Sequence, residues 1–467
     1  MKKSTPLIIF LIIIIFNAIS LFSSLSINDS VLLINFYVNL FTLDLMLLVV
    51  LFLFYKYKVS IFDPVVFILT IYILMFIVTP IYDILNNKIL WFGVNLFKYG
   101  VKGTLIALLG FCGFIFGYFI TYKYKPNSII GEKIYSGKVY QYKNNEAIII
   151  SVVGWIGCLI ISMIYFYLNM GFNIVYILGM GFYGNIDKSI TSDIALGSLY
   201  IFSYSLLPFS LVYLKIGKSK ILKVVMFWMT LAVHFTMGFR FIILTYLAGI
   251  IIMYLISNNK KVKLRYIIIG LFISILLIGL LEVVRGDIRR GSGATLDMFS
   301  FKNSVESVFY NFRIYKTYYG VIKAVPNQVP YMYFDQMLIY TLVMLIPRGI
   351  WPGKPGATGI EAMRVGISEY AAAAGQAYPN LGEFYYSFGI LGVVFFMFIY
   401  GRIAYYFKNK FLDRKNDIMN IMIYSLFLPA NLQLLIRGYL PSNLYFVLFL
   451  LLPIVVIKKI TRVSVSN

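Results

Sequence analysis

Long runs of uncharged, apolar residues leave this chain few possible folds. A helix needs about 20 apolar residues to cross the hydrocarbon core of a bilayer. Runs of that kind recur from "PLIIFLIIIIFNAISLF" near the beginning to "YFVLFLLLPIVVI" near the end. Only 13% of the 467 residues are charged and 61% are hydrophobic, whereas about a quarter of a soluble domain is charged. The sequence therefore predicts an all-α polytopic membrane protein.

The apolar runs predict about 12 transmembrane helices. We expect them near residues 7–23, 31–54, 64–85, 103–122, 147–168, 196–214, 221–238, 240–257, 265–284, 386–407, 417–436 and 440–458. No A-x-A-like cleavage site follows the first run, which we interpret as an uncleaved span. A further run, 331–347, is short and carries Asp335 and Gln336. We interpret it as a helix that lies in or dips into the membrane interface.

Basic residues predict the orientation of these spans. The chain carries 41 Lys and Arg against 18 Asp and Glu, a net charge of +23. In a membrane protein such residues mark cytoplasmic loops rather than a nucleic-acid partner. If 331–347 does not span, more than half of them fall in alternate connections on one side. We therefore expect both termini in the cytoplasm.

This orientation divides a single integral membrane domain into three regions. We expect a nine-span membrane region over 1–284, an external loop over 285–385 and a three-span membrane region over 386–467. A loop of about 100 residues is far above the usual length, which indicates a functional role. The stretch "FKNSVESVFYNFRIYKTYYGVIKAV" predicts short helices within it. The loop also holds ten basic residues, where the orientation rule would favour few.

Several of these cations are suited to a phosphate or pyrophosphate. "EVVRGDIRRG" (282–291) contains Arg285 and Arg289 close to the expected lipid headgroups. A guanidinium binds such oxygens bidentately and stays charged. The alternative is a snorkelling interfacial cluster. In "LIPRGIWPGKPGATG" (345–359), three prolines predict a rigid turn that presents Arg348 and Lys354.

Two further arginines occupy short external turns between spans. Arg240 lies in "MGFRFIIL" and Arg437 in "LIRGYLPSN". An isolated arginine near the membrane is costly, so a functional role is the default interpretation. An ordinary interface anchor is the alternative.

Glu383, in "YPNLGEFYYSFGILG" (378–392), lies where the chain re-enters the membrane. Partial burial would bring its carboxylate into the range of a general base. An ion pair with a nearby arginine is the rival interpretation, and Asp335, Glu361 and Glu369 are competing acids.

Metal and cofactor chemistry have little support. His234 is the only histidine, and one histidine cannot make a zinc site. Because it lies inside a predicted span, a hydrogen-bonded role in the core is favoured. Cys112 and Cys158 lie in apolar runs without metal-ligand spacing. No P-loop or GxSxG motif is present. We predict neither a metal nor a cofactor.

Five short motifs together resemble those of bacterial oligosaccharide repeat-unit polymerases, the Wzy-type enzymes of O-antigen and capsule assembly. They are "IPRGIWPGKP" (346–355), "NLGEFYYSFGILG" (380–392), "GFR" (238–240), "FDPVVF" (62–67) and "LIRG" (435–438). Only the P-R-x-x-W-P-x-K-P element is specific; the others are short. The resemblance implies a GT-C-like, metal-independent glycosyltransferase with one large external loop in the bacterial cytoplasmic membrane.

The resemblance also implies a substrate. This is an oligosaccharide repeat unit on polyprenyl (undecaprenyl) pyrophosphate, with a polysaccharide chain-length regulator and a flippase as further partners. Arg240, Arg285, Arg289, Arg348, Lys354 and Arg437 would bind the leaving pyrophosphate, and Glu383 would assist the acceptor hydroxyl.

Three alternatives stay open. A lipid-linked oligosaccharide flippase would need cations along a cavity within the spans, and few charges lie there. O-antigen ligases carry an external-loop histidine that this chain lacks. Glycosyltransferases that use polyprenyl monophosphate sugars carry acidic pairs in a large first external loop, and "SSLSINDS" is too short for one.

Overall fold

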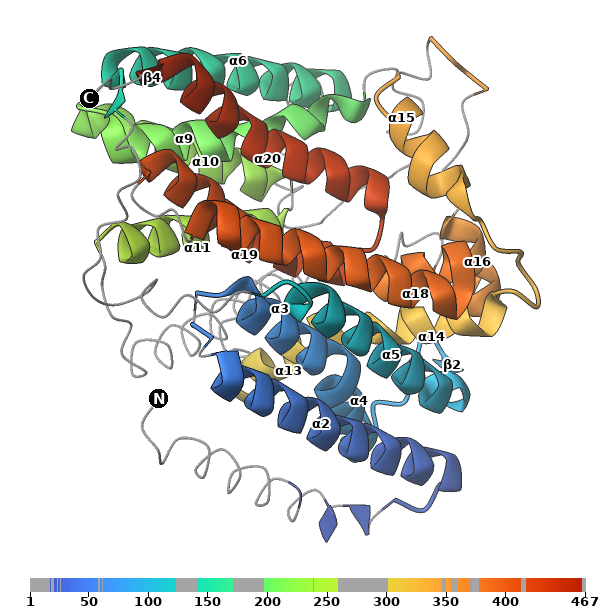
Figure 1. Ribbon diagram of the computed structural model, residues 1–467. Helices are drawn as coiled ribbons and strands as arrows, with labels where there is room; N and C mark the ends of the chain where they lie inside the picture. The colour runs from blue at the N-terminus through green and yellow to red at the C-terminus, as the bar shows by residue number, and fades with distance from the viewer. Residues whose placement is uncertain are drawn as a thin grey trace.

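A computed structural model describes most of the chain. Apart from a few single residues, it describes 27–57, 59–60, 62–122, 141–170, 197–237, 239–258, 301–346, 350–353, 359–369, 378–412 and 417–463. These residues are mostly helical, and the strands among them form only two short pairs (Figure 1). The predicted all-α membrane architecture is confirmed at this level.

Nine helical segments in the described part are long and apolar enough to cross a membrane. They are Ser30–Tyr57 (α2), Pro64–Leu85 (α3, η1 and α4), Phe97–Phe119 (η2 and α5), Asn144–Leu168 (in α6), Leu199–Ile216 (in η3 and α9), Arg240–Ser257 (α11), Asn380–Leu412 (α18 and η6), Ile418–Ile436 (α19) and Leu440–Thr461 (α20). Each coincides with a predicted span.

Three predicted spans are not among these nine. The run 221–238 forms helix α10, Lys220–Thr236, whose 17 residues make it shorter than the others. The runs 7–23 and 265–284 lie almost wholly outside the described residues. The total of 12 spans therefore stays a prediction.

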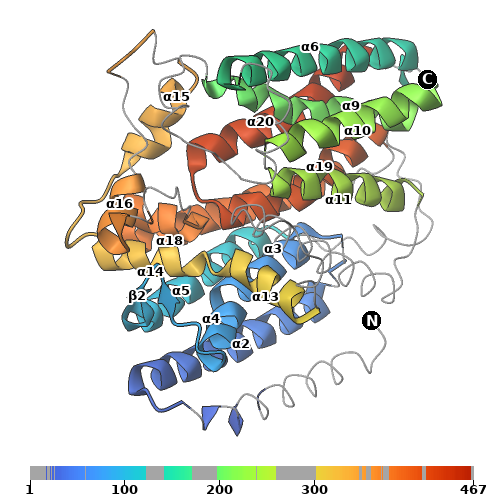
Figure 2. The ribbon, with the colours of Figure 1, turned by 180° about the vertical axis from the view of Figure 1, so that it is seen from behind.

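The helices form two groups that meet at α18 (Figures 1 and 2). Helices α2 to α5 share one apolar core with α14 and α18, and α9, α11, α19 and α20 share another. Helix α5 (Gly100–Phe119) packs along α18 (Asn380–Phe407) at van der Waals distance. Gly113 and Gly117 face the backbone of Val394 and Phe398, which leaves no room for a side chain. Small residues allow membrane helices to approach this closely.

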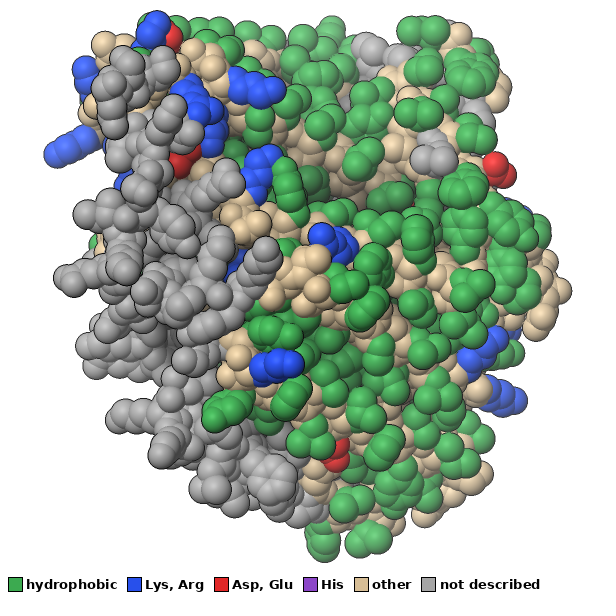
Figure 3. Space-filling view, viewed as in Figure 1, with side chains coloured by type: hydrophobic (Ala, Val, Ile, Leu, Met, Phe, Trp, Pro, Cys, Tyr) green, Lys and Arg blue, Asp and Glu red, His purple; other side chains and the backbone are tan. Residues whose placement is uncertain are grey.

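Basic side chains gather at one end of the bundle. The strand pair Gln141–Tyr142 (β3) and Arg462–Val463 (β4) holds the beginning of α6 (Asn144–Met170) beside the end of α20. Lys56, Lys215 and Lys458 occupy the last turns of their helices. Figure 3 shows Lys and Arg side chains gathered at the upper left of the face that it draws. Basic residues in the last turns of these helices suit the predicted orientation; which end faces the cytoplasm stays a prediction.

The opposite end carries most of the described part of 285–385 (Figure 2). As predicted, they include short helices: Phe301–Phe312 (α13), Tyr315–Ala324 (α14), Asp335–Tyr340 (η5), Thr341–Val343 (α15) and Gly359–Gly366 (α16). The run 331–347 contains only the nine helical residues of η5 and α15, far fewer than the roughly 20 needed to span. Ile339 and Leu342 on it are exposed apolar residues, as at a membrane interface.

Helix α18 is broken near its N-terminal end. Phe388 and Gly389 leave the helical conformation, with φ +64° at Gly389, and separate a short piece, 380–387, from a long spanning piece. We call the short piece the outer piece, because its end of the bundle is the one predicted to be external. Two hydrogen bonds of 3.1 Å tie the outer piece to the preceding chain, Met332 N–H to Tyr386 O and Tyr333 N–H to Ser387 O. The outer piece carries Glu383.

Candidate functional site

Two arginines predicted from separate turns lie close together. Arg240 begins α11, and Arg437 directly follows α19. The Arg437 guanidinium carbon lies 6.0 Å from the centre of the Phe241 ring, one residue beyond Arg240. The two guanidinium charges are near enough to repel each other. Two cations held this way favour a bound anion.

Desolvation lowers the pKa of Arg437, because it destabilises the charged guanidinium. Solvent still reaches the side chain, but the surrounding protein desolvates it enough to lower its pKa, and the Arg240 charge lowers the pKa further. The hydroxyls of Tyr204 and Tyr200 act in the opposite direction. No salt bridge to Arg437 is formed within the part of the chain that the structure describes. An anion bound here would relieve the cost of desolvation.

Aromatic residues surround the arginine pair. Tyr200 and Tyr204, from η3 (Gly197–Ser205), pack on Phe239 with ring centres 5.8 and 6.0 Å apart. Tyr439, two residues beyond Arg437, lies 6.0 Å from Tyr340 of the external segment. Tyr200 and Tyr204 lie close enough to Arg437 to interact with its charge.

Glu383 lies buried beside this cluster, 1% exposed. The Tyr378 hydroxyl and the Leu440 N–H are the polar groups nearest its carboxyl, yet neither oxygen has a hydrogen bond of good geometry within the described residues. No described arginine forms a salt bridge with it. The ion pair that competed with a catalytic role is therefore absent from the described structure.

A backbone contact joins the arginine turn to the Glu383 helix. The Gly438 N–H donates to the Tyr378 carbonyl at 2.7 Å. A Cβ at position 438 would overlap the Pro379 carbonyl, so only glycine allows this approach. The Asn443 side chain donates to the Arg437 carbonyl and fixes the other side of the turn. The "LIRG" and "YPNLGE" motifs, far apart in sequence, thus form one site.

The model of the family O-antigen polysaccharide polymerase Wzy matches residues 7–463, nearly the whole chain. The chain belongs to the Wzy family. No curated protein and no solved structure matches it. Membership indicates a glycosyltransferase-like polymerase with an O-antigen polymerase role, acting on lipid-linked repeat units in a membrane.

Other acids of this Wzy polymerase differ from Glu383. Arg364 pairs with Glu361 at 2.9 Å and with Glu369 at 3.5 Å, and all three side chains are exposed. Asp335 is exposed at the beginning of η5. Glu383 is therefore the one of the four competing acids whose carboxylate is desolvated.

Four of the predicted anion-binding residues are not placed by the structure. Arg285, Arg289, Arg348 and Lys354 lie outside the described residues. Asp63 of "FDPVVF" caps α3 and pairs with Lys408 at 3.8 Å, near the basic end of the Wzy bundle. Its role there is structural.

His234 lies in the protein core, where its Nδ1 is 2.8 Å from the Thr230 carbonyl oxygen. Within the described ranges, no group of His, Cys, Asp or Glu could hold a metal ion.

The sequence did not single out the tyrosines of the Wzy site. The chain contains 39 tyrosines, and no spacing distinguishes Tyr200, Tyr204, Tyr378 and Tyr439 from the others. Their proximity to the arginines, which are themselves recognisable, is the signal that identifies them.

Proposed function

We propose that the protein polymerises polyprenyl-pyrophosphate-linked oligosaccharide repeat units into O-antigen or capsular polysaccharide at the outer face of the bacterial cytoplasmic membrane. One observation carries this proposal. Two guanidinium groups lie together, and the turn that carries Arg437 is hydrogen-bonded to the segment of Glu383, a buried carboxyl that has no salt bridge in the described structure. Both lie at the end of the bundle opposite the basic end. Such a site can bind a dianionic leaving group and accept a proton at neighbouring positions.

The reaction joins the growing glycan to the sugar end of a second lipid-linked unit. The acceptor hydroxyl attacks the anomeric carbon of the donor glycan, and the bond from that carbon to the pyrophosphate oxygen breaks. Glu383 takes the hydroxyl proton, and Arg240 and Arg437 stabilise the negative charge that develops on the pyrophosphate. Arg285, Arg289, Arg348 and Lys354 of the external segment would complete the anion site.

Arginine rather than a metal ion supplies the electrostatic stabilisation in this mechanism. Purified protein with lipid-linked repeat units and excess chelator is expected to build ladders of polymer, since guanidinium forks bind pyrophosphate directly. Gel analysis of the glycan checks this, with a sample reloaded with Mg²⁺ as the control. Polymer that forms only after a divalent metal is restored would contradict the arginine mechanism.

The orientation of the bundle can be tested independently. Gly356→Cys, in the predicted external loop, is expected to react with a membrane-impermeant maleimide in intact cells. The matched control is Lys218→Cys, an exposed position between α9 (Leu206–Ile216) and α10, near the basic end. It should react only after permeabilisation. Both variants are made without Cys112 and Cys158. The reverse pattern would place the proposed site in the cytoplasm.

The position of the arginines weighs against a flippase. A flippase must present cations along a cavity through the membrane. Arg240, at the beginning of α11, and Arg437, after the end of α19, instead lie together at one end of the bundle. An O-antigen ligase would use a histidine of the external loop, and the only histidine of this chain is buried in α10. A chain-length regulator and a flippase remain proposed partners.

A further inference from the structure

A pocket separate from the arginine site lies in the N-terminal helix group, at the predicted external end. Its volume is about 390 Å³, which falls in the range of about 300–1,000 Å³ typical of ligand sites. Its walls come from the connection after α4 (Thr79–Leu85), from the hairpin of Leu90–Trp91 (β1) and Val94–Asn95 (β2), and from α13 and α14. None of the proposed reactive residues lines it.

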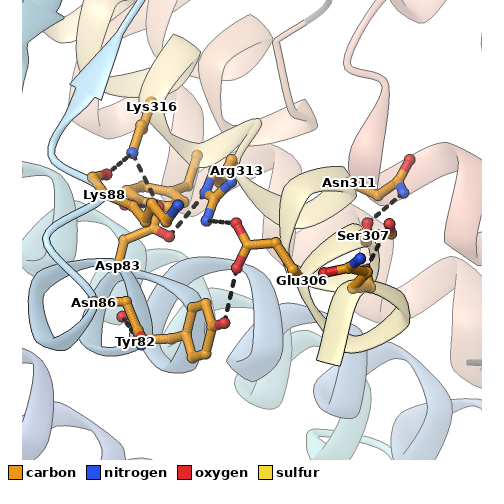
Figure 4. Close-up of polar contacts among 11 residues, drawn as sticks. Tyr82, Asp83, Asn86, Lys88, Glu306, Ser307, Asn311, Arg313 and Lys316 are labelled. Atoms are coloured by element: carbon orange, nitrogen blue, oxygen red, sulfur yellow. Dashed lines mark hydrogen bonds and ion pairs between the residues drawn. The ribbon is translucent and has the colours of Figure 1, made fainter. Parts of the chain in front are cut away.

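A charge-balanced network forms the floor of this pocket (Figure 4). Arg313 pairs with Asp83 at 2.8 Å and with Glu306 at 2.6 Å. Lys316 pairs with Asp83 at 3.0 Å and donates to the Lys88 carbonyl. Two cations thus meet two carboxylates, so the floor offers no spare charge for a pyrophosphate.

Aromatic rings and polar groups make up the walls. Tyr310 is 46% exposed, and its ring centre lies 5.8 Å from that of Trp91 at an angle of 46°. Trp91 is buried, and its indole N–H has no hydrogen-bond partner among the described residues. Lys88 and Asn87 are exposed at the rim. Aromatic faces with flanking amide and ammonium donors suit a pyranose, whose C–H face packs on a ring while its hydroxyls accept hydrogen bonds.

The hairpin holds Phe92 at the pocket in a strained conformation. Trp91 pairs with Val94, so Phe92 and Gly93 form a two-residue turn, with φ +48° and +78°. This is the geometry that favours Asn-Gly or Gly-Gly, and a bulky aromatic residue at positive φ is uncommon. Strain of this kind is concentrated at ligand-binding positions.

We propose that this pocket is a glycan subsite, which binds one sugar residue of the polysaccharide chain at a distance from the arginine pair. The inference rests on the proposed function for the origin of the glycan. Both sites lie at the same end of the bundle, the pocket at β2 and α14 and the arginine turn between α19 and α20 (Figure 1). Retention of the chain here would keep the product near the reactive site between successive transfers.

The hairpin offers a substitution that separates binding from folding. Phe92→Asn removes the ring and supplies the residue type that this turn prefers, which offsets the packing that the half-buried ring gives the core. Thermal unfolding of the variant checks that the fold is kept. Tyr310→Ala removes the exposed ring from α13. Tyr333→Asn is the matched control, because Tyr333 is, like Phe92, an aromatic residue at positive φ (+47°). It is 57% exposed and does not line the pocket.

The probe is a set of short, lipid-free fragments cut from the surface polysaccharide of the organism's own cells. Calorimetric titration into the full-length protein in lipid nanodiscs should give saturable binding. Phe92→Asn and Tyr310→Ala should each weaken it about tenfold, as expected for one lost ring contact. Tyr333→Asn should bind like the parent. The Phe92→Asn polymer should also be shorter, with an unchanged rate of the first transfer.

Unchanged binding in both Phe92→Asn and Tyr310→Ala would overturn the inference. A failure of the proposed function has a different signature. In that case the parent protein makes no polymer from lipid-linked units although the free fragments still bind at the pocket.

Discussion

Replacement of Glu383 by Gln is expected to lower the rate of glycan transfer about 10²–10⁴-fold, the usual contribution of a general base. Binding of the lipid-linked donor should stay near normal, because the amide keeps the size of the carboxyl. Thermal stability should hold or rise. A buried carboxylate without a hydrogen bond or salt bridge in the described structure destabilises the fold, and the neutral amide removes this cost.

Turnover, donor binding and thermal unfolding are to be measured on the same purified variant. Glu361→Gln is the matched control, since Glu361 is exposed and paired with Arg364. It should change transfer little. A merely structural Glu383 would give lower stability with nearly full specific activity. Turnover within a few-fold of the parent would show that Glu383 is not the base.

Arg437→Lys is expected to lower transfer about 10²–10³-fold, the usual effect of removing one preorganised donor to a developing anion. Lysine keeps the charge and loses the planar fork that binds two pyrophosphate oxygens. Arg240→Lys should act in the same way. Because the two guanidinium groups are electrostatically coupled, the double variant should fall short of the product of the single effects.

The matched control for the arginine pair is Arg402→Lys, in the part of α18 that approaches the basic end. Inhibition by the product, polyprenyl pyrophosphate, gives a second measurement, because loss of the fork should weaken it in parallel with transfer. Normal transfer and normal product inhibition in both Arg240→Lys and Arg437→Lys would refute a role in pyrophosphate binding.

Hydropathy predicted the spans well where a helix is apolar throughout. The predicted run 64–85 coincides with Pro64–Leu85, and 240–257 with Arg240–Ser257. Prediction was poorer for 386–407, which in the structure belongs to Asn380–Leu412. The additional residues at the outer end form the helical piece before the break at Phe388 and Gly389. A hydropathy window does not recognise such a piece, because it is held by contacts with the external segment.

The sequence predicted at which end of the bundle the site residues lie, but not which of them are in contact. Counting spans assigned Arg240, Arg437 and Glu383 to one end of the bundle. The Gly438–Tyr378 hydrogen bond that joins their turns links segments about 60 residues apart, and nothing local indicates it.

The basic residues of the external segment also had an explanation that the sequence does not display. Arg313 and Lys316 are neutralised by Glu306 together with Asp83, which belongs to the second of the nine segments long enough to span. A count of loop charges treats these cations as unpaired. Part of the excess of basic residues in the predicted external loop is in fact used in ion pairs within the protein.

The contact at Gly438 supplies a criterion for recognising the same architecture in other chains. "LIRG" alone is too short to be informative, and arginines near membrane turns are common. In the structure the residue at 438 depends on the segment 378–380, since a side chain at 438 would push the turn after α19 away from Pro379. A search that requires an Arg-Gly pair before the last span together with a glutamate four residues after a Tyr-Pro pair's proline should select this geometry far better than either motif alone.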